Sequence, residues 1–320
     1  MKDEAAIIAD VKRAFGGLVA PGAYDFADDA AMIPPVLGAR SRVITTDVVV
    51  EGVDFDRALY PSVYAGFRAL AQNLSDVAAM GAFPIGFVWS LAIPPAWLDD
   101  AALPLADFVR GAAILAKLRT VPLFGGDLSS TSGPLVCSIT AWGDVDGVPV
   151  RRAGANAGDD VYASAPLGAS ARGLAILRAA PPRDRPGPVD LRAFEAWLRA
   201  LPGDEARCVR AHLSPLPADG REMAGVATAC IDVSDGLALD AHRLARASGV
   251  RIDLDALDDA VAPGAARDDA LFGGEDYALL FTVPKGARAE GLRIGRVVDG
   301  EGVWDRGARV IPRGFDHFAR

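Results

Sequence analysis

The feature that most constrains the fold is a repeated alternation of β-branched apolar runs with Ala-rich segments. The run Arg42–Val50 is broken only by Thr and Asp and predicts a buried strand. An Ala-rich stretch over residues 61–80 predicts a helix, and Phe83–Ile93 predicts the next strand, which Pro94 and Pro95 end. The same alternation recurs in the second half, so we expect an α/β or α+β fold.

A turn-rich segment that begins at Arg151 marks the expected boundary between two domains, residues 1–148 and 149–320. A length of 320 residues suits two domains of ordinary size. In the first half, further helices are expected at 3–15 and 99–118, a loop at 22–35, and strands at Val121–Phe124 and Leu135–Val145. In the second half, a helix is expected at 169–179, a Pro-rich loop at 180–190, a helix ending near 248, and strands at Asp160–Ser164, Ala229–Val233, Val250–Leu254, Tyr277–Val283 and Leu292–Val298.

Composition narrows the class of protein. The net charge of −9, the pI of about 4.9 and the presence of only four Lys argue against a nucleic-acid partner. Three Cys without a C-x-x-C pair argue against a disulfide framework or a zinc ribbon. No apolar run reaches the roughly 18–20 residues that a membrane helix needs, and the N-terminus lacks the apolar core of a signal peptide. We therefore expect a cytoplasmic protein with no membrane partner.

The common nucleotide-binding signatures are absent from the sequence. No Gly-Lys dipeptide occurs, which excludes the P-loop. Neither H-R-D nor D-F-G occurs, which excludes a protein kinase. Any phosphate chemistry must therefore use another architecture.

Aspartates recur beside small or apolar residues, at strand ends and in loops. They are Asp28, Asp29, Asp47, Asp76, Asp127, Asp232 and Asp235. Unpaired buried carboxylates are costly, so several of them in apolar surroundings suggest shared cations. Mg²⁺ suits sites made only of oxygen ligands and bridges carboxylates to substrate phosphates.

Each of these motifs also has a purely structural interpretation. Ser234-Asp235-Gly236 is often a turn or a helix N-cap, and Gly125-Gly126-Asp127 is a turn in most proteins. The pair Asp28-Asp29 alone is more often a surface turn. Asp76 is either a backbone cap or a functional group, and its place in an apolar helical stretch favours function. The combination and order of the motifs carry the functional argument.

Taken in order, the motifs resemble those of the thiamine-monophosphate kinase family. They are Ala27–Ala31, Thr45–Asp47, Glu51-Gly52, Asn73–Gly81, Gly125–Asp127, Arg152–Gly154, Ile231–Leu237, Phe272–Tyr277 and Gly314–Phe318. Aminoimidazole ribonucleotide synthetase, selenophosphate synthetase and the hydrogenase-maturation dehydratase share parts of the series. The Gly-Gly-Glu-Asp-Tyr motif and the Asn-Leu-Ser-Asp helix favour the kinase branch.

This resemblance implies a two-domain fold like that of aminoimidazole ribonucleotide synthetase. It implies a homodimer in which the N-terminal sheets of two subunits pair into a β-barrel, with ATP between the domains. It also implies transfer of the γ-phosphoryl group of ATP to thiamine monophosphate with several Mg²⁺ ions, as a step of thiamine diphosphate biosynthesis. The alternatives are a sister ATP-dependent synthetase or dehydratase activity, and a nucleotide-binding protein without turnover.

The resemblance also implies roles for single residues. The implied metal ligands are Asp28 or Asp29, Thr45, Thr46, Asp47, Asp76, Asp127, Asp232 and Asp235. Among them, those expected to be catalytic are Asp47, Asp76, Asp127 and Asp235. The implied ATP contacts are Gly126, Asp127, Arg152 and Ser234, and the implied acceptor contacts are Asp54, Glu275 and Phe315. The structural alternatives for the last two are a surface Glu and a core Phe.

Two positions depart from the family pattern. Ala27 stands where the family usually has Gly, which is a mild change. Asp54 stands where the family usually has a His, expected near the substrate phosphate. An Asp at this position is either an additional metal ligand, or is compensated by Arg57, or indicates a different acceptor.

Overall fold

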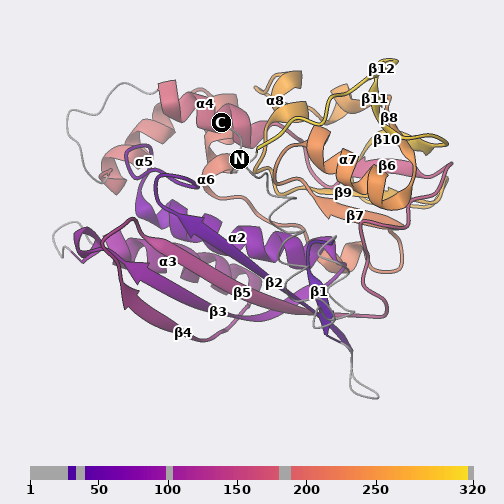
Figure 1. The fold of residues 1–320 in the computed structure, drawn as a ribbon. Coiled ribbons are helices and arrows are strands. Elements are labelled where there is room, and N and C mark those ends of the chain that lie inside the picture. The colour runs from indigo at the N-terminus through magenta and orange to yellow at the C-terminus, as the bar shows by residue number, and fades with distance from the viewer. Residues whose placement is uncertain (1–27, 34–39, 99–103, 180–188, 316–320) are drawn as a thin grey trace.

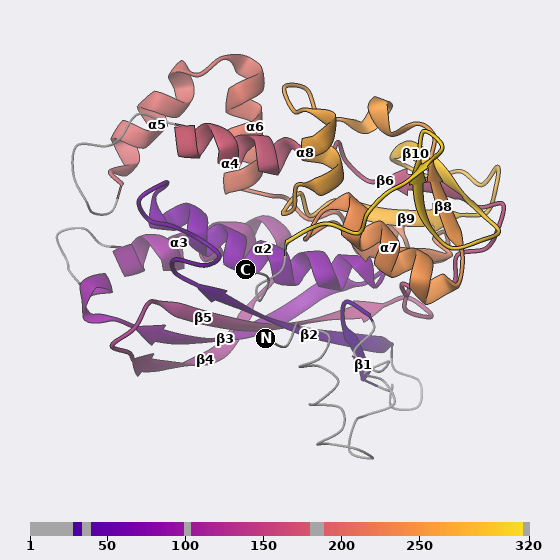
Figure 2. The same ribbon diagram turned by 45° about the horizontal axis from the view of Figure 1, so that its top comes forward.

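The computed structural model describes residues 28–33, 40–98, 104–179 and 189–315. It contains two β-sheets with helices packed between and around them (Figures 1 and 2). The mixed α/β class expected from the sequence is confirmed. The expected helix at 3–15 lies outside the described residues, as do most of the loop at 22–35, nearly all of the loop at 180–190 and the end of the motif Gly314–Phe318.

The first sheet has five strands in the order β1-β2-β5-β3-β4. Their bounds are β1 Ala31–Ile33, β2 Ser41–Val50, β3 Phe83–Ile93, β4 Leu123–Ser130 and β5 Val136–Val145. Strands β2 and β5 form a long antiparallel ladder from the pair Ser41 and Val145 to the pair Val50 and Val136. β4 pairs with β3 in parallel and forms one edge of the sheet.

Two helices, α2 (Ser62–Ala79) and α3 (Pro104–Arg119), cover one face of this sheet (Figure 2). They cross at very short range, because a Cβ on Gly66 would lie 1.8 Å from the Phe108 carbonyl oxygen, and one on Gly111 would lie 1.8 Å from the Val63 carbonyl oxygen. Only glycine allows such an approach of two backbones. The crossing fixes α2, which carries Asp76 and Arg68.

The second sheet has seven strands in the order β12-β11-β8-β10-β6-β9-β7. The bounds are β6 Asp160–Ala163, β7 Ala229–Asp232, β8 Arg251–Leu254, β9 Leu279–Val283, β10 Leu292–Val298, β11 Gly302–Asp305 and β12 Ala308–Arg309. The helices α7 (Leu237–Ser248) and α8 (Arg267–Phe272) belong to this unit and follow β7 and β8 in the chain. Strand β7 lies at the edge that faces α2, which brings the end of β7 to the first unit (Figure 1).

Three helices of the second half, α4 (Ala169–Ala179), α5 (Leu191–Ala200) and α6 (Gly203–Leu213), pack on the first unit. Leu177, Phe194 and Leu213 belong to the same apolar cluster as residues of α2 and α3. The two sheets therefore separate near residue 150, whereas one apolar core draws on both sides of that point.

Three helices were not expected from the sequence, namely α5, α6 and α8. The expected strand at Val121–Phe124 instead begins at Leu123 and continues through Gly125-Gly126-Asp127 to Ser130, because the parallel pairing with β3 continues to Ile93. Among the described residues, no helix combines the length and the apolar character that a bilayer crossing requires.

Candidate functional site

Three carboxylates from distant parts of the chain meet where the two units face each other. Asp29 precedes β1, Asp76 lies in the last turns of α2, and Asp232 ends β7. One carboxylate oxygen from each lies within 4.8 Å of the other two. Three oxygen ligands at this spacing suit a divalent cation. The structure thus brings together three of the aspartates that the sequence singled out.

Hydroxyl groups orient two of these carboxylates. The Thr45 Oγ1 donates to Asp76 Oδ2 at 2.6 Å, and the Ser75 Oγ donates to Asp232 Oδ2 at 2.7 Å. Thr45 and Asp47 lie on the same face of β2, because side chains of a strand alternate between its two faces. The Thr46 side chain lies on the opposite face, where its hydroxyl donates to the Ile139 carbonyl oxygen at 3.0 Å.

The acidic group lacks enough positive charge to balance it. Burial and repulsion by neighbouring carboxylates raise the pKa of Asp76 and Asp232 well above the ordinary value. Burial and then the charge of Asp54 raise the pKa of Asp47 to about 6, with smaller contributions from Asp29 and Asp235. Asp54 and Asp235 therefore face Asp47 as well. A bound cation would remove this repulsion.

Arg151 and Arg152 partly compensate the first pair of aspartates. The Arg152 Nε and Nη2 donate to the two oxygens of Asp29 at 3.0 and 2.8 Å. Asp28 accepts from the Arg151 Nε at 2.9 Å and from the Arg152 backbone N–H at 2.8 Å. Asp28 thus fixes the start of the second unit, whereas Asp29 faces the carboxylate cluster.

The Ser234-Asp235-Gly236 turn is held by two residues of α7 that sequence reasoning missed. The buried Asp240 accepts from the backbone N–H groups of Asp235 and Gly236, both at 3.1 Å. Arg243 then donates to both Asp235 and Asp240 through its Nη1. Burial raises the pKa of Asp240 to about 7. The spacing of Asp235, Asp240 and Arg243 along a predicted helix start was the signal available in the sequence.

The structure does not bring Gly126 and Asp127 to the cluster. Both lie on the exposed edge strand β4, opposite Trp89 and Ser90 of β3. Strands β5 and β3 stand between β4 and Asp47 on β2. Three strand spacings make about 14 Å. Within the described part of this one chain, Asp127 is therefore separate from the other aspartates.

Of the three residues expected to contact the acceptor, Asp54 acts on Asp47 and Phe315 lies at the Ser-Asp-Gly turn. The Asp54 Oδ2 accepts from the Val50 backbone N–H at 2.7 Å and closes the turn after β2. Arg57 is directed to Glu51 and lies 4.6 Å from the Trp97 ring centroid, so the structure does not show Arg57 compensating Asp54. The Phe315 backbone N–H donates to the Asp235 carbonyl oxygen at 3.1 Å, which places the backbone of this half-exposed residue beside the Ser-Asp-Gly turn.

Glu275 was expected to be a contact for the acceptor, and its partners were not expected. Arg68 of α2 donates to Glu275 and to the His212 carbonyl oxygen. Gln72, one helical turn further, acts on Asp47 and lowers the pKa of that carboxyl group against the effect of burial. Arg68, Gln72 and Asp76 are spaced by four residues, a signal already visible in the predicted helix at 61–80.

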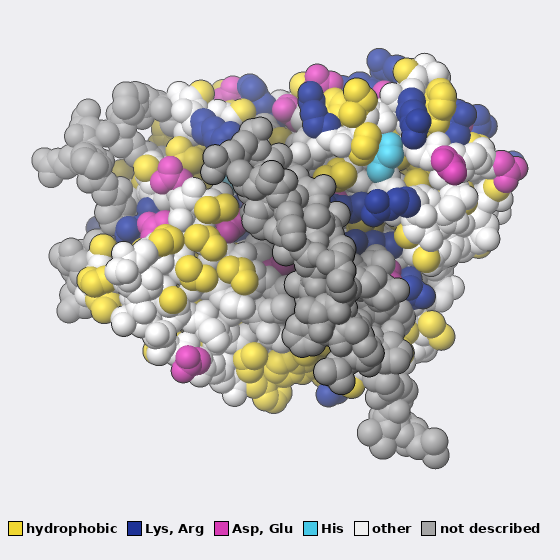
Figure 3. Space-filling view, viewed as in Figure 1, with side chains coloured by type: hydrophobic (Ala, Val, Ile, Leu, Met, Phe, Trp, Pro, Cys, Tyr) yellow, Lys and Arg dark blue, Asp and Glu magenta, His cyan; other side chains and the backbone are white. Residues whose placement is uncertain are grey.

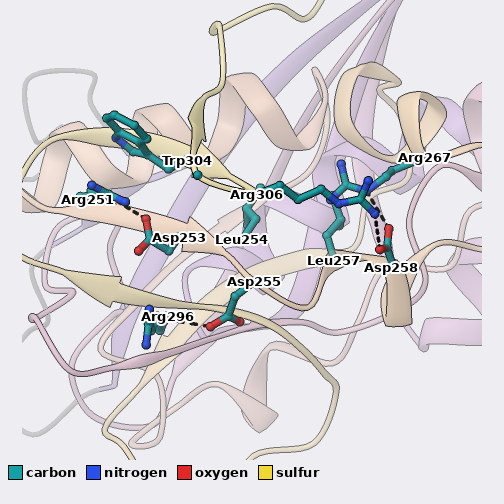
Figure 4. A pocket seen from close by; sticks show the side chains of 11 residues that line it. Arg251, Asp253, Leu254, Asp255, Leu257, Asp258, Arg267, Arg296, Trp304 and Arg306 are labelled. Carbon is teal, nitrogen blue, oxygen red and sulfur yellow. Dashed lines mark hydrogen bonds and ion pairs between the residues drawn. The ribbon is translucent and has the colours of Figure 1, made fainter.

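A separate hollow of about 390 Å³ lies in the second unit (Figure 4). Its lining alternates arginines with aspartates, and the pairs are Arg251 with Asp253, Arg267 and Arg306 with Asp258, and Arg296 with Asp255. Basic side chains also gather over this unit in Figure 3. Because the arginines of the hollow are matched by carboxylates, its surface is nearly charge-balanced, and it plays no part in the cluster above.

Comparison with known proteins agrees with this arrangement. The family described as AIR synthase related protein, N-terminal domain, matches residues 27–145. Thiamine-monophosphate kinase of Aquifex aeolicus is 32% identical over 307 residues, which cover 91% of this chain and 92% of the relative. The Escherichia coli K12 protein of the same name is 36% identical over 272 residues, 81% of this chain and 75% of the relative.

A solved structure is also similar to this chain over nearly its whole length. The structure called AaThiL complexed with AMPPCP and TMP superimposes with a TM-score of 0.82 at 30% identity, over 99% of this chain and 97% of the other. The two-sheet fold and its matched N-terminal domain define a protein of the AIR synthase-related class. Within that class, the chain belongs to the thiamine-monophosphate kinase family.

Proposed function

We propose that this protein transfers the γ-phosphoryl group of ATP to thiamine monophosphate, which gives thiamine diphosphate and ADP. The observation that carries the proposal is the meeting of Asp29, Asp76 and Asp232 within 4.8 Å where the two units face each other. Relatives that share most of the chain are named for this activity, and one solved neighbour holds AMPPCP and TMP. The chemistry requires a site for two phosphate-bearing molecules, and a shared set of carboxylates supports it.

The ligands available at the cluster fit Mg²⁺. All are oxygens, and burial with mutual repulsion raises the pKa of Asp76 and Asp232, which a divalent cation would relieve. We assign the metal to Asp29, Asp47, Asp76, Asp232 and Asp235, with Thr45 in support through its contact with Asp76. The Thr46 hydroxyl lies on the other face of β2 and Asp28 is paired with Arg151, so we do not assign these two side chains to the metal. When bound, Mg²⁺ neutralises the repulsion between donor and acceptor phosphates. Asp47, Asp76 and Asp235 act by holding it, and the same role is proposed for Asp127.

The chain's own groups position the two substrates. Arg152 is in contact with Asp29, so its guanidinium stands beside the cluster and can bind a phosphate of ATP. Ser234 lies in the turn that Asp240 holds, which supports its assignment to ATP. Glu275 and Phe315 are assigned to the thiamine rings, one by charge and one by stacking. Asp54 adds a carboxylate near Asp47, where an acceptor phosphate would be repelled.

We further propose a homodimer in which the five-stranded sheets of two copies form one β-barrel. The β4 edge supports this, because Leu123, Phe124 and Leu128 are about half to two-thirds exposed there. Leu123 and Leu128 also border an apolar hollow of about 370 Å³. Gly126 and Asp127 lie on the same strand, far from the cluster of their own chain. Pairing of two copies through their β4 edges would bring Gly126 and Asp127 of one copy toward the other copy.

The oligomeric state is tested with Leu128→Lys and sedimentation. A sheet-to-sheet dimer buries Leu128, so the variant is expected to become monomeric, whereas Leu118→Lys on α3, another exposed Leu outside the hollow, is expected to stay dimeric. A monomeric wild type refutes the dimer.

We also propose two domains: residues 1–148 form the unit of the barrel, and residues 149–320 form the unit of the second sheet. The three cysteines are buried and free, which supports a cytoplasmic location.

The activity is tested by incubating the protein with ATP, Mg²⁺ and thiamine monophosphate and separating the products. We expect thiamine diphosphate and ADP in equal amounts. Asp76→Asn is expected to abolish turnover with a thermal midpoint near that of the wild type, and the surface variant Asp107→Asn serves as control. A folded wild type that releases ADP only with another acceptor in a panel indicates the sister activity instead. A folded wild type that binds ATP but releases no ADP with any acceptor indicates a binding protein without turnover.

A further inference from the structure

One face of α2 connects the carboxylate cluster to Glu275. Arg68, Gln72 and Asp76 follow one another at intervals of four residues, so they lie along the same side of the helix. Arg68 contacts Glu275, and Asp76 accepts from Thr45. Gln72, between them, lowers the pKa of Asp47. Eight residues of helix rise by about 12 Å. The helix thus fixes the separation of the two backbone positions from which Arg68 reaches Glu275 and Asp76 reaches the cluster.

Both Nη atoms of Arg68 donate hydrogen bonds, and one of them contacts Glu275. Its side chain is 5% exposed, whereas that of Glu275 is 32% exposed. The Nη2 donates to Glu275 Oε1, and the Nη1 donates to the His212 carbonyl oxygen. A buried guanidinium requires a counter-charge, so breaking the pair would leave Arg68 with an uncompensated buried charge. Glu275 is held from the inside while part of its carboxylate stays accessible.

The backbone of Glu275 is strained and tied down. Its φ is 66°, and Tyr277 has a φ of 50°, both in the left-handed region that costs non-glycine residues of the order of 1–3 kcal/mol each. The Glu275 N–H donates to the Ser234 carbonyl oxygen at 2.7 Å, and the Tyr277 N–H donates to the Val233 carbonyl oxygen at 3.0 Å. Strained residues that the surroundings hold in this way cluster at binding sites.

A second chain of contacts fixes His212, the other neighbour of Glu275. Asp276 accepts from the backbone N–H groups of Gly168 and Ser170, at 2.6 and 3.0 Å, at the start of α4. The Ser170 Oγ lies 3.0 Å from His212 Nδ1, and that nitrogen lies 3.6 Å from Glu275 Oε2. Burial and the charge of Arg68 lower the pKa of His212 well below its usual value. The imidazole is therefore neutral, and among the described residues the charged partner of Glu275 is Arg68.

We propose that Arg68, which lies about 12 Å along α2 from Asp76, is a positioning residue of the acceptor site and holds Glu275 so that it receives the cationic ring system of a phosphate-bearing acceptor. This inference rests on the proposed kinase function. The site would then select acceptors by their length as well as by their charge, because the acceptor phosphate must reach the cluster while its rings reach Glu275. Arg68 acts through Glu275 and touches neither the phosphates nor the metal ligands.

The test is a double-mutant cycle with Arg68→Met and Glu275→Gln, read as kcat and as KM for thiamine monophosphate and for ATP. Each single variant is expected to raise KM for thiamine monophosphate by about tenfold or more, as for the loss of a hydrogen bond to a charged group, with KM for ATP unchanged. In the Glu275→Gln background, Arg68→Met is expected to add little. Additive effects on KM, or equal effects on both substrates, overturn the inference.

Because Arg68→Met leaves Glu275 without a partner and is itself at risk of misfolding, Arg68→Lys is measured beside it. Lys keeps the charge but cannot reach both Glu275 and the His212 carbonyl oxygen, so an intermediate KM for thiamine monophosphate is expected, and an unchanged one refutes the inference. Arg119→Met is the matched control, because Arg119 is a part-buried Arg of α3 that donates to the Pro217 carbonyl oxygen. Wild-type protein without thiamine diphosphate formation refutes the proposed function itself, whereas wild-type turnover with unaffected variants refutes only the role of Arg68.

Discussion

Arg152 donates hydrogen bonds to both oxygens of Asp29, at 2.8 and 3.0 Å. The contact joins a residue expected to bind ATP to a residue expected to bind metal. The two side chains come from the start of the second unit and from the segment before β1. A bidentate pair of this kind fixes both groups in orientation as well as in charge. A cation held by Asp29 would compete with the guanidinium for this carboxylate, and Arg152 could then bind a phosphate of ATP.

Arg152→Lys is therefore expected to lower kcat/KM for ATP by about 100-fold, because one ammonium group cannot replace a planar fork that serves a carboxylate and a phosphate. KM for thiamine monophosphate is expected to change much less. Steady-state kinetics with each substrate varied in turn checks this. Arg151→Lys is the neighbouring control, since Arg151 contacts Asp28 rather than Asp29. Equal losses in the two variants contradict the assignment.

Addition of Mg²⁺ is expected to raise the thermal midpoint, because a cation bound to the folded state relieves the repulsion among Asp29, Asp76 and Asp232. At a concentration 100 times the dissociation constant the gain is about 2.7 kcal/mol. Thermal melts with and without a chelator measure it. Asp232→Asn is expected to lose most of the metal response, and Asp253→Asn, a carboxylate of the distant hollow, is expected to keep it. A full response in Asp232→Asn argues against a metal at the cluster.

Asp54 offers a test of substrate choice. Asp54→Asn removes a charge that acts on Asp47 but keeps an oxygen that can accept from the Val50 N–H, so the turn is preserved. KM for thiamine monophosphate is expected to fall several-fold at low salt, because one carboxylate fewer faces the incoming phosphate. Asp54→His is expected to lower it further. If both variants bind this acceptor more weakly, Asp54 is a ligand rather than an obstacle.

The sequence predicted the alternation of strands and helices well, because the runs at Arg42–Val50 and 61–80 carry the periodicity of elements buried on defined faces. It could not show that α4 to α6 pack on the first unit, since α5 has only Phe194 and Leu198 fully buried and looks like a surface helix. Motif order identified the aspartates but not the distances among them, which depend on how the two sheets dock.

The same limit explains why the supports of the site were missed. Asp240, Arg243 and His212 belong to no motif and act through contacts over long sequence separations or across a helix turn. Arg68 was missed as well, although its spacing from Asp76 was visible within one predicted helix. The sequence could not show that its partner is Glu275, which lies 207 residues further along the chain.

His212 is expected to make stability depend on pH below neutrality. Its pKa in the folded protein is well below the value of 6.5 that it has when unfolded, because burial and the charge of Arg68 disfavour the imidazolium. Between these two values the unfolded chain binds a proton that the folded protein does not. The contribution of His212 is therefore fully present above pH 6.5, and stability falls as the pH drops below it, by up to about 1.4 kcal/mol per pH unit.

Urea titrations from pH 8 to pH 5 of the wild type and of His212→Asn measure this contribution. Asn keeps an acceptor near the position of Nδ1 for Ser170, so the variant should fold, with some loss of stability at pH 8 from the smaller side chain. Because the carboxyl groups with raised pKa values contribute alike to both proteins, the stability advantage of the wild type over the variant is expected to shrink as the pH falls below 6.5. Parallel curves for the two proteins would mean that His212 is protonated in the folded state, and Arg68 would then share Glu275 with a second cation.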